Sequence, residues 1–127
     1  MKARRTLILI EDEPILARVF ERLLEPSFDV VCFHRADHAL DALQRGHSCD
    51  AILCDMHLPD ATGVEVHGRL SKTRPDLAGR MIFMTGGAVG TMEAFLDEHA
   101  DRVLRKPFAR EDLLAILARV TPLCEGS

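Results

Sequence analysis

Short apolar runs alternate with amphipathic segments along the whole chain. The apolar runs cover residues 6–10, 29–33, 51–54, 81–84 and, more weakly, 102–104. Most of these runs are continuously hydrophobic, which is typical of parallel strands that are buried on both faces of a sheet. We therefore predict one parallel β-strand at each of these positions.

A helical pattern follows each predicted strand. The first pattern begins at Pro14, a residue suited to a first helical turn, the second ends at Gly46 and the third ends before Pro75. Two further patterns follow the last two strands, and the second of them ends before Pro122. Their apolar positions recur with helical spacing. In chain order these are Ile15, Leu16, Val19, Phe20 and Leu23; Ala39, Leu40 and Leu43; Val66 and Leu70; Met92, Phe95 and Leu96; Leu113, Leu114, Ile116, Leu117 and Val120.

This order of elements predicts an α/β fold. Right-handed crossovers and short loops would arrange a five-stranded parallel sheet flanked by five helices, a doubly wound (βα)5 flavodoxin-like three-layer sandwich. We expect a single domain over residues 1–127, with its core at about residues 5–121 and a tail from Pro122. Ligands of such sheets bind beyond the carboxyl ends of the strands, at the topological switch point.

Polar side chains stand where four of the predicted strands end. Because the carboxyl ends of parallel strands share one edge, we expect these side chains to converge. Clustered carboxylates repel one another unless a cation lies among them, and Mg²⁺ accepts a few carboxylates while leaving positions for phosphate oxygens. The residues are Glu11 and Asp12 after the first strand, Asp55 after the third, Thr85 and Gly86 after the fourth and Lys106 after the fifth.

A carboxylate beside Mg²⁺ and a lysine can act as a nucleophile toward a phosphoryl group. In-line phosphoryl transfer requires little beyond positioning and neutralisation of the charge on the equatorial oxygens. Mg²⁺ and Lys106 would each bind one such oxygen, and the Thr85 hydroxyl and the Gly86 N–H would bind the third. The residues therefore predict an aspartyl phosphate at Asp55.

Each of these residues also has an ordinary structural role. Glu11 and Asp12 are placed to cap the following helix, whose dipole favours anions. Asp55 would then be a loop residue, Thr85 a helix cap and Lys106 a solvated cation. Their joint placement at equivalent strand ends favours the functional interpretation.

Four short motifs match those of a known family in order and spacing. They are LILIEDEP, ILCDMHLPDATG, IFMTGG and LRKPF. With these motifs the chain resembles, over essentially its whole length, the CheY-like receiver domain of bacterial two-component response regulators. The phrases FMTGG and RVLRKPF also resemble the receiver modules of hybrid histidine kinases.

The resemblance implies a role for each residue at the predicted site. Asp55 would accept a phosphoryl group from a histidine kinase or a histidine phosphotransfer protein. Asp12 would bind Mg²⁺ directly, Glu11 mainly through water, and the backbone carbonyl of His57 would be a further ligand. The resemblance further implies that Thr85 is the switch hydroxyl, Lys106 the phosphate-binding lysine and Pro107 a cis-proline. It places Pro59 and Gly63 in the turn after the acceptor strand, and His57 and Gly87 at positions that tune dephosphorylation. The alternative for His57 is a side chain that only points to solvent.

One position departs from the family pattern. Val103 stands where the family has a Tyr or Phe, whose ring rotates inward when the switch hydroxyl is drawn to the phosphoryl group. A valine has few rotamers and no ring to swing. We expect the Thr85 half of this coupling to be present and the aromatic half to be absent or replaced. The other histidines are expected at the surface: His34, His38, His47, His67 and His99.

Composition and charge narrow the range of partners. The net charge of −4 disfavours direct binding to nucleic acid or to an anionic membrane, and no apolar run is long enough to span a bilayer. Cys32, Cys49, Cys54 and Cys124 form no CxxC pair and have no histidines at zinc-ligand spacing. We expect reduced thiols and a cytoplasmic location.

These patterns predict a signalling domain that modifies only itself, not an enzyme with a separate substrate. Its output would be protein–protein contact, including a homodimer through the fourth helix, fifth strand and fifth helix. The alternative is a pseudo-receiver, an interaction module that is never phosphorylated, but such domains usually lack an acid, the Thr or the Lys. A flavodoxin-like nucleotide binder would need a phosphate-cradling loop where the carboxylates stand. A phosphatase with an Asp nucleophile would need a second acid in place of His57.

Overall fold

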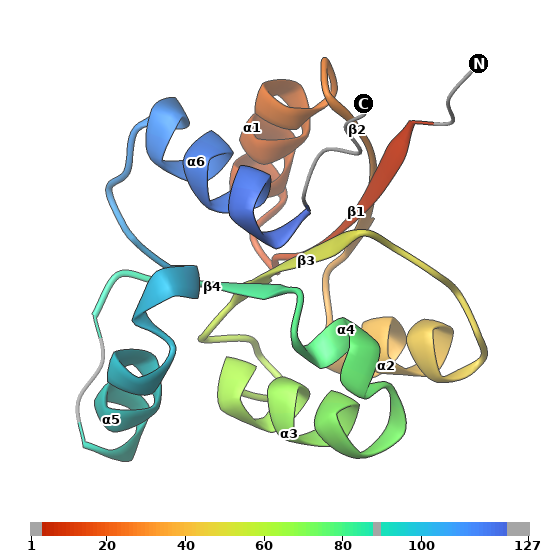
Figure 1. The fold of residues 1–127 in the computed structure, drawn as a ribbon, viewed down its shortest axis with the longest axis vertical. Coiled ribbons are helices and arrows are strands. Elements are labelled where there is room, and N and C mark those ends of the chain that lie inside the picture. The colour runs from red at the N-terminus through yellow and green to blue at the C-terminus, as the bar shows by residue number, and fades with distance from the viewer. Residues whose placement is uncertain (1–3, 88–89, 122–127) are drawn as a thin grey trace.

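The computed structural model describes residues 4–87 and 90–121. Within these ranges five parallel strands form one sheet in the order β2-β1-β3-β4-β5 (Figure 1). Each strand begins and ends within one residue of the predicted run, so the predicted sheet is confirmed. The strands are β1 (Arg5–Ile10), β2 (Phe28–Phe33), β3 (Ala51–Asp55), β4 (Met81–Thr85) and β5 (Val103–Arg105).

All five predicted helices are present, and a sixth short helix was not predicted. This additional helix, α4, begins at Pro75, the residue that we expected only to end the helix before it. Proline cannot continue a helix because it lacks an N–H, but its fixed φ suits the first turn of a new one. The helices are α1 (Pro14–Leu24), α2 (Ala36–Gln44), α3 (Gly63–Thr73), α4 (Pro75–Ala78), α5 (Thr91–Glu98) and α6 (Arg110–Val120), with a 3₁₀-helix η1 (Ala100–Arg102) before β5.

Each face of the sheet carries its own hydrophobic core. Helices α1 and α6 cover one face, and α2 to α5 cover the other (Figure 1). Along β1 the side chains alternate, so that Leu7 and Leu9 pack toward α1 while Ile8 and Ile10 pack toward α2. Strands β3 and β4 are buried along their whole length, which explains their continuously apolar sequences.

The carboxyl ends of four strands meet at one edge of the sheet. Asp55 at the end of β3 pairs with Met84, and Thr85 at the end of β4 pairs with Arg105. The strand order reverses between β1 and β3, which makes this edge the topological switch point. The predicted tail from Pro122, together with Cys124, lies outside the described residues. Within the described ranges no helix has both the length and the apolar content that a membrane crossing requires.

Two predictions about side-chain burial are wrong. His67 and His99 are half-buried among aromatic rings, whereas His34, His38 and His47 are exposed as expected. His67 follows the buried Val66 on α3, and an imidazole can pack its apolar face and edge against other rings. Burial of both histidines therefore depends on which face of each helix meets the sheet.

The amphipathic stripe predicted on α1 is also only partly buried. Phe20 is buried and Leu16 and Leu23 are half-buried, but Ile15 is 81% exposed and Val19 is 47% exposed. Ile15 and Val19 lie one helical turn apart, so they share a face that points away from the sheet. This face lies beside the carboxyl edge, because α1 begins directly after the acidic residues that follow β1.

Candidate functional site

Three carboxylates gather at the carboxyl edge between β1 and β3. One oxygen from each of Glu11, Asp12 and Asp55 lies within 4.8 Å of the other two. Glu11 directly follows β1 and is fully buried, Asp12 is half-buried, and Asp55 is the last residue of β3 and is 6% exposed. The two central strands therefore position the cluster that the sequence predicted.

Glu11 presents a buried carboxylate oxygen that lacks a protein donor. Its Oε2 accepts a hydrogen bond from the N–H of Glu13 at 3.2 Å, and its Oε1 has no hydrogen-bond partner in residues 4–87 and 90–121. Burial raises the pKa of Glu11 to about 7, the Glu13 N–H opposes this rise, and the charge of Asp55 adds to it. A buried, unsatisfied carboxylate is costly, and a hard cation among these oxygens would offset that cost. The donor set therefore fits Mg²⁺.

Asp55 is held by contacts from two directions. Its Oδ2 lies 3.3 Å from Lys106 Nζ, and its Oδ1 accepts a hydrogen bond from the backbone N–H of His57 at 2.9 Å. The backbone N–H of Lys106 donates to the carbonyl of Thr85 at 2.7 Å, which ties the ends of β4 and β5 together. The peptide bond between Lys106 and Pro107 is cis, as the resemblance implied.

Thr85 lies at the end of β4 and is almost fully buried. Its Oγ1 accepts a hydrogen bond from the N–H of Gly87 at 3.0 Å, so the hydroxyl proton can still be donated to a ligand. The carbonyl of Gly87 lies 3.1 Å from Nε2 of His57, whose side chain is exposed. Gly86, which stands between Thr85 and Gly87 in the chain, is exposed, and a Cβ there would meet no atom within 4 Å. The loops after β3 and β4 are thus linked across the site.

The loop that carries His57 is fixed by a close approach of two backbones. A Cβ added to Gly63 would lie 2.5 Å from Met56 Sδ and 3.3 Å from Met56 Cα, so only glycine fits without a shift. Before it, the N–H of Leu58 donates to the carbonyl of Ala61 at 3.1 Å and closes a turn that contains Pro59. The close approach explains why residue 63 is a glycine, and Pro59 lies inside the turn that the Leu58–Ala61 hydrogen bond closes.

Val103 is half-buried on β5, where it pairs with Phe83 on β4. Its side chain packs against the core that α2 to α5 cover. Arg105, two residues further along β5 on the same side of the sheet, is exposed and forms an ion pair with Glu93 on α5 at 3.0 Å. The place of the family's aromatic residue is thus filled by a small aliphatic side chain.

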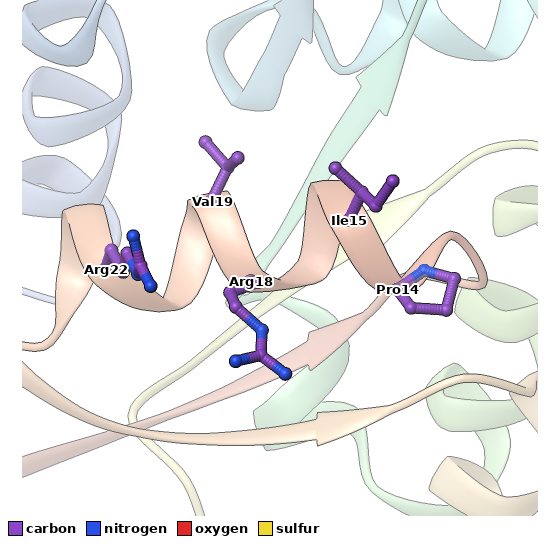
Figure 2. Close-up of a pocket in the computed structure, with 5 residues that line it drawn as sticks. All are labelled: Pro14, Ile15, Arg18, Val19 and Arg22. Atoms are coloured by element: carbon purple, nitrogen blue, oxygen red, sulfur yellow. The ribbon is translucent and has the colours of Figure 1, made fainter.

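An apolar surface lies along α1 next to the site. Figure 2 shows Ile15 and Val19 projecting from the same side of the helix. Together with Pro14, Arg18 and Arg22 they line a surface cavity of about 330 Å³. We call these five residues the α1 surface. The sequence contained its signal, since Ile15 and Val19 repeat at helical spacing, but periodicity alone assigned them to the core.

The three cysteines of the described residues have unreactive thiols. Cys54 precedes Asp55 and is fully buried, and burial raises the pKa of its thiol well above its ordinary value. Burial likewise raises the pKa of Cys32 and of Cys49 to about 11. All three are free cysteines, and a protonated buried thiol is a poor nucleophile and a poor metal ligand.

Comparison with known proteins identifies one family. The response regulator receiver domain family matches residues 7–118. The chain is 34% identical over 111 residues to the uncharacterized transcriptional regulatory protein YkoG of Bacillus subtilis, covering 86% of this chain and 47% of that protein. It is 31% identical over 122 residues to the response regulator MprA of Mycobacterium avium, covering 93% of this chain and 53% of that protein. The chain therefore spans about half the length of these curated relatives.

Solved structures agree with the fold. The receiver domain of the sensor histidine kinase PA1611 from Pseudomonas aeruginosa superposes with a TM-score of 0.80 at 29% identity, covering 98% of this chain and 100% of that chain. That structure has a magnesium ion coordinated in its active site cleft. The signal receiver domain of an HD domain-containing protein from Pseudomonas fluorescens gives a TM-score of 0.82 at 22% identity, covering 95% of this chain and 90% of that chain, and shows likeness of fold alone.

Proposed function

The chain belongs to the response regulator receiver domain family, and from this premise we propose that Asp55 accepts a phosphoryl group from a histidine kinase or a histidine phosphotransfer protein. The observation that carries the proposal is the position of the Asp55 carboxylate, which lies in the acidic cluster and 3.3 Å from Lys106 Nζ. The pseudo-receiver alternative is not favoured, because the acids, Thr85 and Lys106 all lie at the same edge of the sheet.

In the proposed reaction an Asp55 oxygen attacks the phosphorus of phosphohistidine. The new O–P bond forms as the P–N bond breaks, and the donor imidazole leaves with the electron pair. The Lys106 ammonium neutralises charge on the transferred oxygens, and the Thr85 hydroxyl and Gly86 N–H donate hydrogen bonds to them. Mg²⁺, when held by Glu11, Asp12, Asp55 and the His57 carbonyl, would supply further charge neutralisation.

Phosphorylation would then act on the loop after β4. It adds close to two negative charges and new acceptor oxygens, which attract the Thr85 hydroxyl. Because Thr85 Oγ1 already accepts from the Gly87 N–H, a movement of Thr85 would also displace Gly87. This proposed route from Asp55 to the β4–α5 loop does not require a ring at Val103.

We propose that the protein donor binds over the α1 surface. Helix α1 starts two residues after Asp12 of the acidic cluster, and its exposed Ile15 and Val19 offer apolar contacts to a donor. The arginines Arg18 and Arg22 on the same surface can pair with acidic side chains of a donor.

Ile15→Asp is expected to slow phosphoryl transfer from a phosphorylated histidine kinase about tenfold, because it places a charge in the apolar contact. Transfer from phosphoramidate, a small donor with a P–N bond, should not change. The measurement is the initial rate of phosphorylation of both chains by each donor. If neither donor labels the native chain, the phosphoacceptor proposal fails. If Ile15→Asp leaves transfer from the kinase unchanged, only the α1 proposal fails.

We propose that the His57 side chain slows loss of the phosphoryl group. Its link to the Gly87 carbonyl spans the mouth of the site and narrows the approach of water to Asp55. His57→Ala should shorten the lifetime of the phosphorylated chain about threefold, whereas His57→Gln, which can still donate to Gly87, should preserve it. The decay of the adduct after removal of the donor measures this, and equal decay of all three proteins would contradict it.

The output is proposed to be contact with another protein, as in the receiver module of a larger regulator or hybrid kinase. A homodimer through α5, β5 and α6 stays a prediction. It is supported by a groove of about 450 Å³ that residues of β5 and α6 line. Sedimentation of the phosphorylated and unphosphorylated chain would test it, and identical monomeric behaviour of both forms would exclude the dimer.

A further inference from the structure

Helix α5 is held to the rest of the domain by few buried residues. Leu96 is the one fully buried residue among Thr91–Glu98. The helix begins after Gly90, whose φ is 65°, and no side chain within the described ranges caps its first turn. A helix of this length is not stable alone. Its position therefore depends on the contacts that it makes with α3 and β4.

Four rings meet between α5 and these elements, and we call them the ring cluster: His67 on α3, Phe83 on β4, Phe95 on α5 and His99 directly after α5. Phe95 and His99 stack with ring centroids 4.2 Å apart. His67 meets Phe95 edge-on at 5.3 Å, and Phe83 meets Phe95 edge-on at 5.1 Å. Aromatic contacts thus connect α5 to both elements beneath it.

One positive charge already lies beside the ring cluster. The rings of His67 and His99 lie 5.1 Å apart. From η1 the guanidinium of Arg102 lies 5.8 Å from the Phe83 ring, and it is fixed there by a 2.9 Å hydrogen bond to the Ala78 carbonyl. In the described ranges the titratable or charged groups that face His67 are His99 and Arg102, and β4 contributes only the uncharged Phe83.

We propose that the ring cluster is a proton-sensitive contact that holds α5 against α3 and β4 while the His67 imidazole is neutral and that loosens this helix on acidification. A proton on His67 would place a cation in a half-buried position beside Arg102 and His99. Burial, His99 and Arg102 all lower the pKa of His67 in the docked state. The docked state therefore binds fewer protons than the loosened one, and its advantage falls as the pH drops through the ordinary histidine value.

This inference does not depend on phosphorylation of Asp55. It concerns α5, the helix that follows Thr85 in the chain. Protonation would therefore act on the same part of the domain as the proposed movement of Thr85 after phosphorylation. The ring cluster also lies next to Val103, the position where the family has an aromatic residue, because Phe83 is the strand partner of Val103. Aromatic rings are therefore present on this face of the sheet, but α3, β4 and the end of α5 carry them instead of β5.

The test is amide hydrogen exchange of the full chain at about pH 8 and about pH 5.5, which bracket the ordinary histidine titration. After correction for intrinsic exchange rates, opening of α5 should increase about fivefold at the lower pH, while α6 serves as the reference. His67→Phe retains a ring without a titrating group and should remove this response. His38→Phe, at an exposed position on α2, should retain it.

Two results of the hydrogen-exchange experiment would overturn the proposal. One is an equal change in α5 and α6, which would indicate general destabilisation by acid. The other is a response of α5 that persists in His67→Phe. If this variant does not fold, the NMR titration of the His67 Cε1 proton in the native chain decides. The proposal requires that titration and the shifts of the α5 amides to occur over the same pH interval, and titration without a change in α5 contradicts it.

Discussion

Replacing Asp55 by asparagine is expected to abolish phosphoryl acceptance. Asparagine has nearly the same shape, but its neutral amide cannot attack phosphorus and cannot form the 3.3 Å ion pair with Lys106. The amide oxygen of the introduced asparagine can still accept the hydrogen bond from the His57 N–H. The variant should therefore fold while losing its reactivity.

The intact mass of the chain after incubation with acetyl phosphate and Mg²⁺ measures this loss. Asp41→Asn is a suitable control, because Asp41 lies on the exposed side of α2, where its side chain pairs with Arg45 just after the same helix. This control should acquire the adduct as the native chain does. An adduct of native extent in Asp55→Asn would show that another residue accepts the phosphoryl group, and the assignment of Asp55 would be wrong.

Lys106→Met is expected to slow phosphorylation of Asp55 about 100-fold. Methionine fills a similar volume but removes the charge that faces the Asp55 oxygen, and loss of one such electrostatic contact typically costs about 2.7–4 kcal/mol in the transition state. The carboxylates would then repel the incoming phosphoryl oxygens without the ammonium to offset them. The initial rate of adduct formation from acetyl phosphate at fixed Mg²⁺ is the measurement.

Lys72→Met provides the matched control for this lysine. Lys72 is exposed on α3, away from the carboxyl edge of the sheet, and its replacement should leave the rate unchanged. Lys106→Arg retains the charge on a bulkier group and should give an intermediate rate. If Lys106→Met reacts as fast as the native chain, Lys106 is a structural partner of Asp55 and does not bind the phosphoryl group.

The sheet and the site were predictable from local signals. The sequence of each buried strand is a continuous apolar run, and Glu11, Asp55 and Thr85 stand at the ends of such runs. Because parallel strands align their carboxyl ends, a correct set of strands brings these side chains together without further information. The convergence of the acidic cluster required no knowledge of helix packing.

Helix burial was less predictable, because the angle at which a helix meets the sheet is a tertiary property. Ile15 and Val19 have the spacing of core residues, yet the buried face of α1 is the one that carries Ala17, Phe20 and Leu24. The link between His57 and Gly87 joins two loops that are 30 residues apart in sequence, so no local pattern contains it. Such contacts follow only once both loops have been placed.

Val103 carries no ring, so we expect the aromatic half of the switch coupling to be absent or replaced. The contacts of Thr85 with Gly87 and of Lys106 with Thr85 and Asp55 do not involve the side chain of Val103. The side chain that would report the switch on β5 is replaced, and the four rings of the ring cluster belong to α3, β4, α5 and the residue directly after α5. Any effect of phosphorylation on this face would have to pass through those elements.

The most direct test of the central claim locates the phosphoryl group itself. The chain is incubated with acetyl phosphate and Mg²⁺, treated with borohydride, which converts an aspartyl phosphate to homoserine, and mapped by peptide mass spectrometry. We predict homoserine at position 55, and none when a chelator removes Mg²⁺. Homoserine at another position, or an unmodified Asp55 in a chain that binds Mg²⁺, would contradict the assignment of Asp55 as the phosphoacceptor.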